Sequence, residues 1–104
     1  MLFMDAFPQL LEEIRRLLNE TNASQIAAQL ESLVIVDRCR CGDDFCATFY
    51  TAPKPAGRYG KGHRSVSLEP AKGMIVLDVI DEKVVQIEVL YRDEIREKLH
   101  KMMP

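Results

Sequence analysis

The sequence predicts an α+β fold: an antiparallel meander sheet of about five strands, with N-terminal helices and a C-terminal helix packed on one face. Apolar residues recur at helical spacing near both ends of the chain, whereas β-branched and aromatic runs fill its middle. The links between these runs are short except for one. Because a parallel crossover needs a dozen or more residues, neighbouring strands are expected to be antiparallel.

Length and composition predict a single domain over residues 1–104. The chain is 47% hydrophobic and 29% charged, which is an ordinary supply of core residues. A chain of this size buries enough surface to fold without a metal or disulfides, although with little margin.

Two helices are expected at the N-terminal end. After Pro8, leucine and isoleucine recur with the spacing of one helical face, which predicts a helix over 8–20. Pro8 suits the first turn, where its missing N–H would have no partner. Asn22 and Gln25 resemble a capping box, and a further apolar stripe predicts a shorter helix over 23–32.

Five runs of β-branched and aromatic residues are typical of strands, and they are residues 33–36, 45–51, 63–69, 74–80 and 84–91. Turn-forming residues separate the first run from the second and the fourth from the fifth, which indicates two hairpins. Beyond the last run, Asp93 can cap a C-terminal helix that packs apolar residues on the core.

Residues 52–62 are predicted to form a long loop, because they contain two prolines and three glycines. The loop and the strand start after it carry the candidate contact residues Arg58, Tyr59, Lys61 and Arg64. Glycines let backbone N–H groups approach an anion, and the cationic side chains supply charge. No helix follows the glycines and no Ser or Thr follows the lysine, so nucleotide-binding loops are excluded. A solvated loop, a loop that docks on a protein or nucleic-acid partner, and an active-site lid stay as alternatives.

Charge is unevenly distributed along the chain. Overall, 14 basic and 16 acidic residues give −2, which disfavours a nucleic-acid partner. Residues 1–33 carry −3, residues 34–72 carry +3 and residues 73–104 carry −2. In the acidic last third, Asp93, Glu94 and Glu97 are candidates for binding a cationic protein partner.

All three cysteines fall within eight residues, as Cys39, Cys41 and Cys46. Thiolates suit Zn²⁺, and His63 is the best fourth ligand, with His100 as the alternative. A second interpretation is a redox module, in which neighbouring arginines lower a thiol pKa. A third is packing alone, because free cysteine is among the most buried residue types.

No nucleophile elbow, paired-carboxylate signature or metal-hydrolase helix is present, so enzymatic activity is not expected. The chain has no apolar run of the ~20 residues that a membrane span needs. Its N-terminus lacks the basic start and cleavage site of an export signal. A cytoplasmic location without membrane contact is therefore expected.

Two segments resemble small bacterial proteins of unassigned activity: the hairpin over 73–90, and the segment Arg-Cys-Arg-Cys-Gly-Asp-Asp-Phe-Cys over 38–46. In size, acidity and lack of catalytic parts the chain is similar to immunity proteins of bacterial toxin systems, including contact-dependent growth inhibition. The resemblance implies a non-catalytic, antitoxin-like protein that binds and neutralises a cognate toxin. The alternative is a small zinc-binding or thiol redox-sensing domain.

Overall fold

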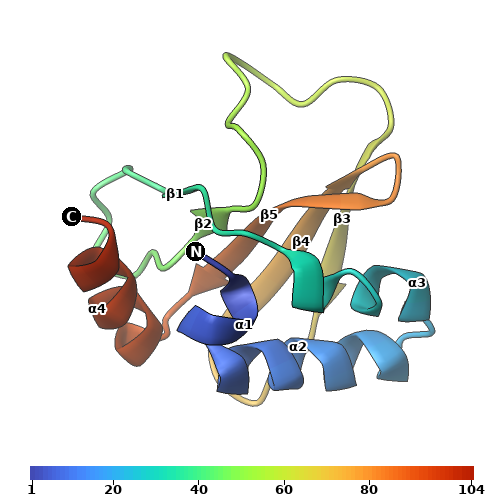
Figure 1. The fold of residues 1–104 in the computed structure, drawn as a ribbon, viewed down its shortest axis with the longest axis horizontal. Helices are drawn as coiled ribbons and strands as arrows, with labels where there is room; N and C mark the ends of the chain where they lie inside the picture. The colour runs from blue at the N-terminus through green and yellow to red at the C-terminus, as the bar shows by residue number, and fades with distance from the viewer.

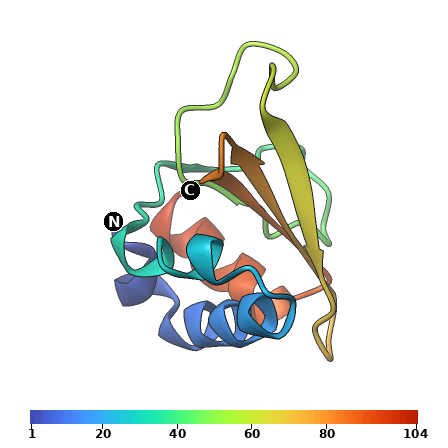
Figure 2. The same ribbon diagram turned by 90° about the vertical axis from the view of Figure 1, so that its right-hand side faces the viewer.

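The predicted fold class is confirmed, because helices cover one face of a five-stranded antiparallel sheet (Figures 1 and 2). The computed structural model describes residues 1–104. In chain order the elements are α1 (Phe3–Ala6), α2 (Pro8–Glu20), α3 (Ser24–Ala27), a 3-10 turn (Leu30–Ser32), β1 (Asp37–Arg38), β2 (Phe49–Tyr50), β3 (His63–Leu68), β4 (Met74–Ile80), β5 (Lys83–Leu90) and α4 (Asp93–Met102).

The sheet has the strand order β1-β2-β5-β4-β3, and every neighbouring pair is antiparallel. Strands β3, β4 and β5 form a meander, whereas β1 and β2 form a hairpin that pairs with β5. The meander is interrupted once, because residues 51–62 carry the chain from β2 to the far edge at β3. This segment is the predicted long loop, and it projects beyond the ends of the strands (Figure 2).

A two-residue turn closes the hairpin of β4 and β5. Asp81 and Glu82 both have positive φ angles, 50° and 68°, as a type I′ turn requires. The same turn contacts the start of β3, where the Asp81 N–H donates to the carbonyl of Gly62 at 3.1 Å. Gly62 has φ +84°, and a Cβ there would overlap the Asp81 carboxylate. Position 62 therefore requires glycine, which ends the long loop against this turn.

The helices supply half of a single apolar core. Helix α2 begins at Pro8 and ends at Glu20, as predicted, and its buried residues are Leu10, Leu11, Ile14, Leu17 and Leu18. The rings of Phe3 and Phe7 lie 5.4 and 6.0 Å from the ring of Phe49 on β2. Helix α4 adds Ile95 and Leu99 to the same core. None of the helices has the length and apolar character needed to span a bilayer.

The first predicted strand is displaced along the chain. Residues 33–36 are not a regular strand, and β1 is Asp37–Arg38 instead. The Ile35 N–H donates to the carbonyl of Met1, whereas the Val36 N–H donates to that of Tyr50. A continuous ladder needs one partner strand, and this segment divides its hydrogen bonds between two. The N-terminal partner precedes α1, a short helix that the sequence analysis did not predict.

Two other predicted elements are shorter than expected. Strand β2 contains two residues, because the Thr48 hydroxyl accepts from the Val89 N–H at 3.1 Å and replaces a backbone acceptor. The helix predicted over 23–32 is divided into α3 and the 3-10 turn. Between them, the Gln29 side chain accepts from the Val84 N–H at 3.0 Å and donates to the Glu82 carbonyl. The break therefore coincides with the docking of Gln29 on the β4–β5 turn.

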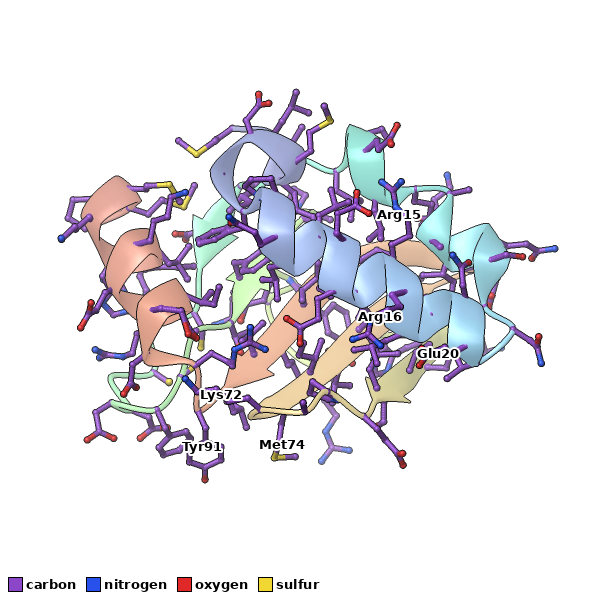
Figure 3. The ribbon with its side chains drawn as sticks, turned by 90° about the horizontal axis from the view of Figure 1, so that it is seen from below. Arg15, Arg16, Glu20, Lys72, Met74 and Tyr91 are labelled. Atoms are coloured by element: carbon purple, nitrogen blue, oxygen red, sulfur yellow. The ribbon has the colours of Figure 1, made fainter.

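The outer face, defined here as the sheet face turned away from the helices, carries most of the polar strand residues. Pairing places Ser65, Asp78, Gln86 and Tyr50 in one row across β3, β4, β5 and β2. Met74 also lies on this face, and Figure 3 shows it and Tyr91 on the side away from α2. Asp78 and Tyr50 are nevertheless buried. Other segments must therefore cover part of the outer face.

Candidate metal centre

An irregular bend over residues 39–48 joins β1 to β2. The Cys39 N–H donates to the Thr48 carbonyl at 2.8 Å, which continues the pairing of β1 and β2. Gly42 has φ +82°, the left-handed conformation that glycine adopts without strain. The Cys46 N–H then donates to the Asp43 carbonyl at 3.3 Å and closes the bend. Cys46 pairs with Leu90 of β5 through an isolated bridge.

The bend brings all three cysteines together. The sulfur atoms of Cys39, Cys41 and Cys46 all lie within 4.8 Å of one another. Cys46 is buried, Cys39 is half-buried, Cys41 is exposed, and none forms a disulfide. In a tetrahedral site with Zn–S bonds of about 2.3 Å, bound sulfurs stand about 3.8 Å apart. The three cysteines therefore lie close enough together to hold a metal ion.

The pKa values of the thiols are shifted in opposite directions. Burial raises the pKa of Cys46, but hydrogen bonds from the Thr48 hydroxyl and amide and from the other two thiols outweigh it, and the pKa is lowered. The Asp43 amide lowers the pKa of Cys41, but burial and the other two sulfurs prevail and raise it to about 11. Of the three thiols, Cys46 is therefore the one whose deprotonation its surroundings favour, and metal binding requires deprotonated thiols.

The redox interpretation requires an exposed cysteine with a low pKa. In this cluster Cys41 is the exposed thiol, and its pKa is raised. The pKa is lowered at Cys46, which is buried. The exposed thiol and the thiol with the lowered pKa are therefore different residues.

His63, the expected fourth ligand, is not part of the group of close ligand atoms. Its Nε2 lies 2.9 Å from Oδ1 of Asp78 on β4. On its other side the ring packs on Tyr59 of the long loop, with 4.8 Å between the ring centroids. His100, the alternative, lies close to the arginines at 38, 40 and 96, and burial and these charges lower its pKa.

Asp78 is the centre of a second polar cluster, which we call the carboxyl network and define as Tyr59, His63, Ser65, Asp78, Gln86 and Glu88. Besides His63, the Ser65 hydroxyl donates to Asp78 Oδ1 at 2.8 Å. Oδ2 of Asp78 is buried and has no hydrogen-bond partner with a defined geometry. Glu88 lies on the neighbouring strand β5, and a hydrogen bond to Asp78, burial and the Asp78 charge raise the pKa of Glu88 to about 7. The neighbouring carboxylate therefore favours the protonated form of Glu88.

Asp78 itself stays ionised within the carboxyl network. Burial raises its pKa, but hydrogen bonds from Glu88, His63 and Ser65 outweigh burial, and the pKa is lowered. The sequence alone does not predict this network, because strand register assembles it from three strands. One signal was available: Asp78 interrupts the apolar run 74–80, and a charged residue in a buried strand needs partners.

Two of the predicted contact residues at the long loop are free, and the other two are bound to the protein itself. Arg58 and Lys61 are exposed and have no ion-pair partner. Tyr59 instead points back to the sheet, and its hydroxyl donates to Gln86 Oε1 at 2.7 Å. Arg64 forms two hydrogen bonds to the Glu82 carboxylate, at 2.8 and 2.7 Å. Only Arg58 and Lys61 therefore keep free charges.

Asp93, Glu94 and Glu97 lie at the opposite end of the strands from the loop. All three are exposed on α4, which follows the end of β5. Glu94 pairs with Arg92 at 3.1 Å and with Lys72, in the turn before β4, at 3.9 Å. The long loop instead meets the start of β3 and the β4–β5 turn. The acidic and basic candidates therefore do not form one surface.

Comparison with known proteins gives no relative from which a function could be transferred: no protein-family model, curated protein or solved structure matches the chain.

Proposed function

We propose that the chain is a small zinc-binding domain in which Cys39, Cys41 and Cys46 supply thiolate ligands. The observation that carries this proposal is the mutual approach of the three sulfurs to within 4.8 Å. Thiolates are soft ligands that select Zn²⁺ or Cu⁺ over Mg²⁺ and Ca²⁺. Zn²⁺ is favoured because it does not change oxidation state and binds sulfur ligands in tetrahedral geometry. Small rotations of the three side chains would bring the sulfurs to tetrahedral spacing.

The metal would serve the fold as a cross-link between β1 and β5. The bend over 39–48 joins two strands of only two residues each, so few regular hydrogen bonds hold this edge of the sheet. Cys39 extends β1, whereas Cys46 is bridged to Leu90 on β5. Metal bound to both would fix the edge, and binding energy of this kind stabilises the folded state directly.

The test is zinc content and affinity in protein purified without chelator or metal-affinity resin. Wild type is expected to hold one Zn²⁺ per chain and to unfold at higher temperature with zinc than after chelation. Cys39→Ser, Cys41→Ser and Cys46→Ser should each lose most of the bound zinc. Ser67→Ala is the matched control, since Ser67 is exposed on the same sheet and lies outside the cluster. A wild-type chain that takes up no zinc contradicts the proposal.

We propose protein binding, in the sense of a toxin-neutralising partner, as a second candidate function. The observation that favours it is on α4, where Asp93 and Glu97 are exposed one turn apart and have no ion-pair partner. An unpaired acidic pair suits a cationic protein surface. Arg58 and Lys61 lie on the long loop, at the opposite end of the strands from α4.

Affinity purification at native abundance from the host tests this candidate. A stoichiometric partner should bind wild type and be lost from Asp93→Lys/Glu97→Lys. Glu12→Lys/Glu20→Lys, which reverses two exposed acids on α2, is the charge-matched control. A partner that binds both variants equally removes α4 as its contact. No stoichiometric partner in an intact preparation contradicts the candidate function.

A further inference from the structure

The donor set of the proposed metal centre is incomplete within the chain. A tetrahedral zinc site has four ligands, and sites with three protein ligands take the fourth from outside. Here the group of close ligand atoms contains Cys39, Cys41 and Cys46 alone. Neither histidine belongs to this group: His63 binds Asp78, and His100 lies near Arg38, Arg40 and Arg96.

The centre is accessible from one side only. Cys46 is buried where it pairs with Leu90, whereas Cys41 and the next residue, Gly42, are exposed. A Cβ placed on Gly42 would meet no atom within 4 Å, so the space beside the bend is open. An external ligand would therefore approach past Cys41 and Gly42.

Two arginines near the centre can offset part of the charge of an anionic ligand. Arg38 and Arg40 flank Cys39, and the Arg38 guanidinium donates to the Cys39 carbonyl at 3.2 Å. Asp37 pairs with Arg40 at 2.9 Å, Asp43 and Asp44 lie in the bend itself, and Arg38 has no ion-pair partner. Three thiolates on Zn²⁺ carry one net negative charge, and a fourth thiolate adds another. The arginines offset this charge without occupying a coordination position.

An apolar ledge, defined as Phe45, Met74 and Tyr91, adjoins the centre. Phe45 precedes Cys46, and its ring stacks on Tyr91 with 5.2 Å between centroids. Met74 pairs with Leu90, the residue that bridges to Cys46. Met74 and Tyr91 are 50% and 55% exposed, and both lie on the side away from α2 (Figure 3). Three side chains suit a small apolar group, since stable protein interfaces bury about 800 Å² on each partner.

We propose that the metal centre binds a small external thiol as its fourth ligand, with the sulfur on the metal and an attached apolar group on the ledge. The proposal rests on the proposed zinc-binding function. In this role the chain recognises an apolar thiol. Cys39, Cys41 and Cys46 hold the metal, the arginines balance the charge, and Tyr91 contacts the apolar group.

The experiment uses the full chain loaded with Co²⁺, whose absorption bands report the ligand set. Benzyl mercaptan and 2-mercaptoethanol are titrated separately, and native mass spectrometry checks that the metal is retained. Both thiols are expected to change the bands saturably and to give a 1:1 adduct. Benzyl mercaptan should bind about fivefold more tightly, because its ring buries apolar surface on the ledge. Tyr91→Ala should remove that preference and leave the binding of 2-mercaptoethanol unchanged.

Three outcomes would overturn the inference while leaving zinc binding intact. In the first outcome, thiols cause no spectral change in a metal-loaded chain. In the second, the spectrum depends on protein concentration, because a second copy of the chain supplies the fourth ligand. In the third, Asp43→Asn or Asp44→Asn alters the spectrum before thiol is added, because a carboxylate of the bend is the fourth ligand. A chain that takes up no Co²⁺ or Zn²⁺ overturns the proposed function itself.

Discussion

The carboxyl groups of Glu88 and Asp78 interact across strands β5 and β4. A hydrogen bond to Asp78, burial and the Asp78 charge raise the pKa of Glu88 to about 7. His63 contacts the other oxygen of the same carboxylate, with its Nε2 at 2.9 Å from Asp78 Oδ1. Glu88, His63 and Ser65 thus all bind the Asp78 carboxylate.

Replacing Glu88 by glutamine should change how stability depends on pH. The folded-state pKa of Glu88, about 7, lies above its ordinary value of 4.5, so folding favours the protonated form. Its stabilising effect is complete below about pH 4.5 and is lost as pH rises through about 7. The glutamine amide keeps an N–H donor at every pH. The Glu88→Gln variant should therefore match wild type at pH 5 and exceed it at pH 8 by on the order of 1 kcal/mol, because solvent screens a half-buried carboxyl.

Urea unfolding at pH 5 and pH 8 measures this effect. Glu69→Gln is the matched control, since Glu69 is exposed and has no ion-pair partner. An equal stability difference between Glu88→Gln and wild type at the two pH values would show that Glu88 does not share a proton with Asp78.

The fold is predictable where short-range patterns decide it. Helix α2 begins and ends where apolar spacing and Pro8 place it, and β4 spans the apolar run 74–80. Residues 33–36 have the composition of a buried strand but not its pairing, because their hydrogen bonds go to Met1 and Tyr50. Composition identifies an extended segment, whereas the partners come from parts of the chain that only the folded structure brings together.

The same distinction separates the two polar clusters. Cys39, Cys41 and Cys46 are close in sequence, so their meeting follows from a single bend and can be predicted from spacing. The carboxyl network depends on the pairing of Asp78 with Ser65 and Gln86 across three strands. Without strand order, the sequence gives His63 no partner, and it is therefore expected to bind the metal. With strand order, its nearest partner is a buried carboxylate.

Tyr59 should control the local stability of the long loop. Its ring packs against His63 in a tilted arrangement and its hydroxyl donates to Gln86, whereas Arg58 and Lys61 on either side are exposed. Tyr59→Ala removes both contacts and is expected to speed tryptic cleavage at Arg58 and Lys61 by about fivefold to tenfold, equivalent to about 1 kcal/mol of local opening. Tyr59→Phe keeps the ring contact with His63, so its cleavage rate should lie between those of wild type and Tyr59→Ala.

Cleavage after Lys98 in α4 is the internal control, because that helix is remote from the loop and should be cut at the same rate in all three proteins. If Tyr59→Ala is cleaved at the wild-type rate, the loop does not depend on this side chain for its position.

Truncation of Phe49 should destabilise the fold more than truncation of any other aromatic residue. It is fully buried on β2 and contacts the rings of Phe3 and Phe7, so it joins the sheet to the N-terminal helices. Phe49→Ala is expected to destabilise the fold by roughly 3–5 kcal/mol, through lost burial and the cavity left behind. Val36→Ala, at a side chain that is 46% exposed, should cost less than about 1 kcal/mol. Thermal or urea unfolding compares them, and similar losses would show that this aromatic contact does not organise the core.

The ion pair between Arg92 and Glu13 should contribute more to the free energy of unfolding than the surface pairs of α2 do. Two guanidinium nitrogens of Arg92 lie 3.0 and 2.9 Å from the two carboxylate oxygens of Glu13, and the side chains are 13% and 21% exposed. Arg92→Met leaves a partly buried carboxylate without its counter-charge, so a loss of about 2–3 kcal/mol is expected. Adding Glu13→Gln should recover part of that loss, which gives a coupling energy on the order of 1–2 kcal/mol.

The pair of Arg16 and Glu20 on α2 is the control for this double-mutant cycle. Its atoms are 3.1 Å apart, but the side chains are 60% and 59% exposed, and Figure 3 shows both on the surface of the helix. Solvent screens such a pair, and its coupling should be below about 0.5 kcal/mol. Urea unfolding of the single and double variants of both pairs measures the two couplings. Equal couplings would mean that the Arg92–Glu13 pair is as fully solvated as a surface pair, and that packing alone joins α2 to the start of α4.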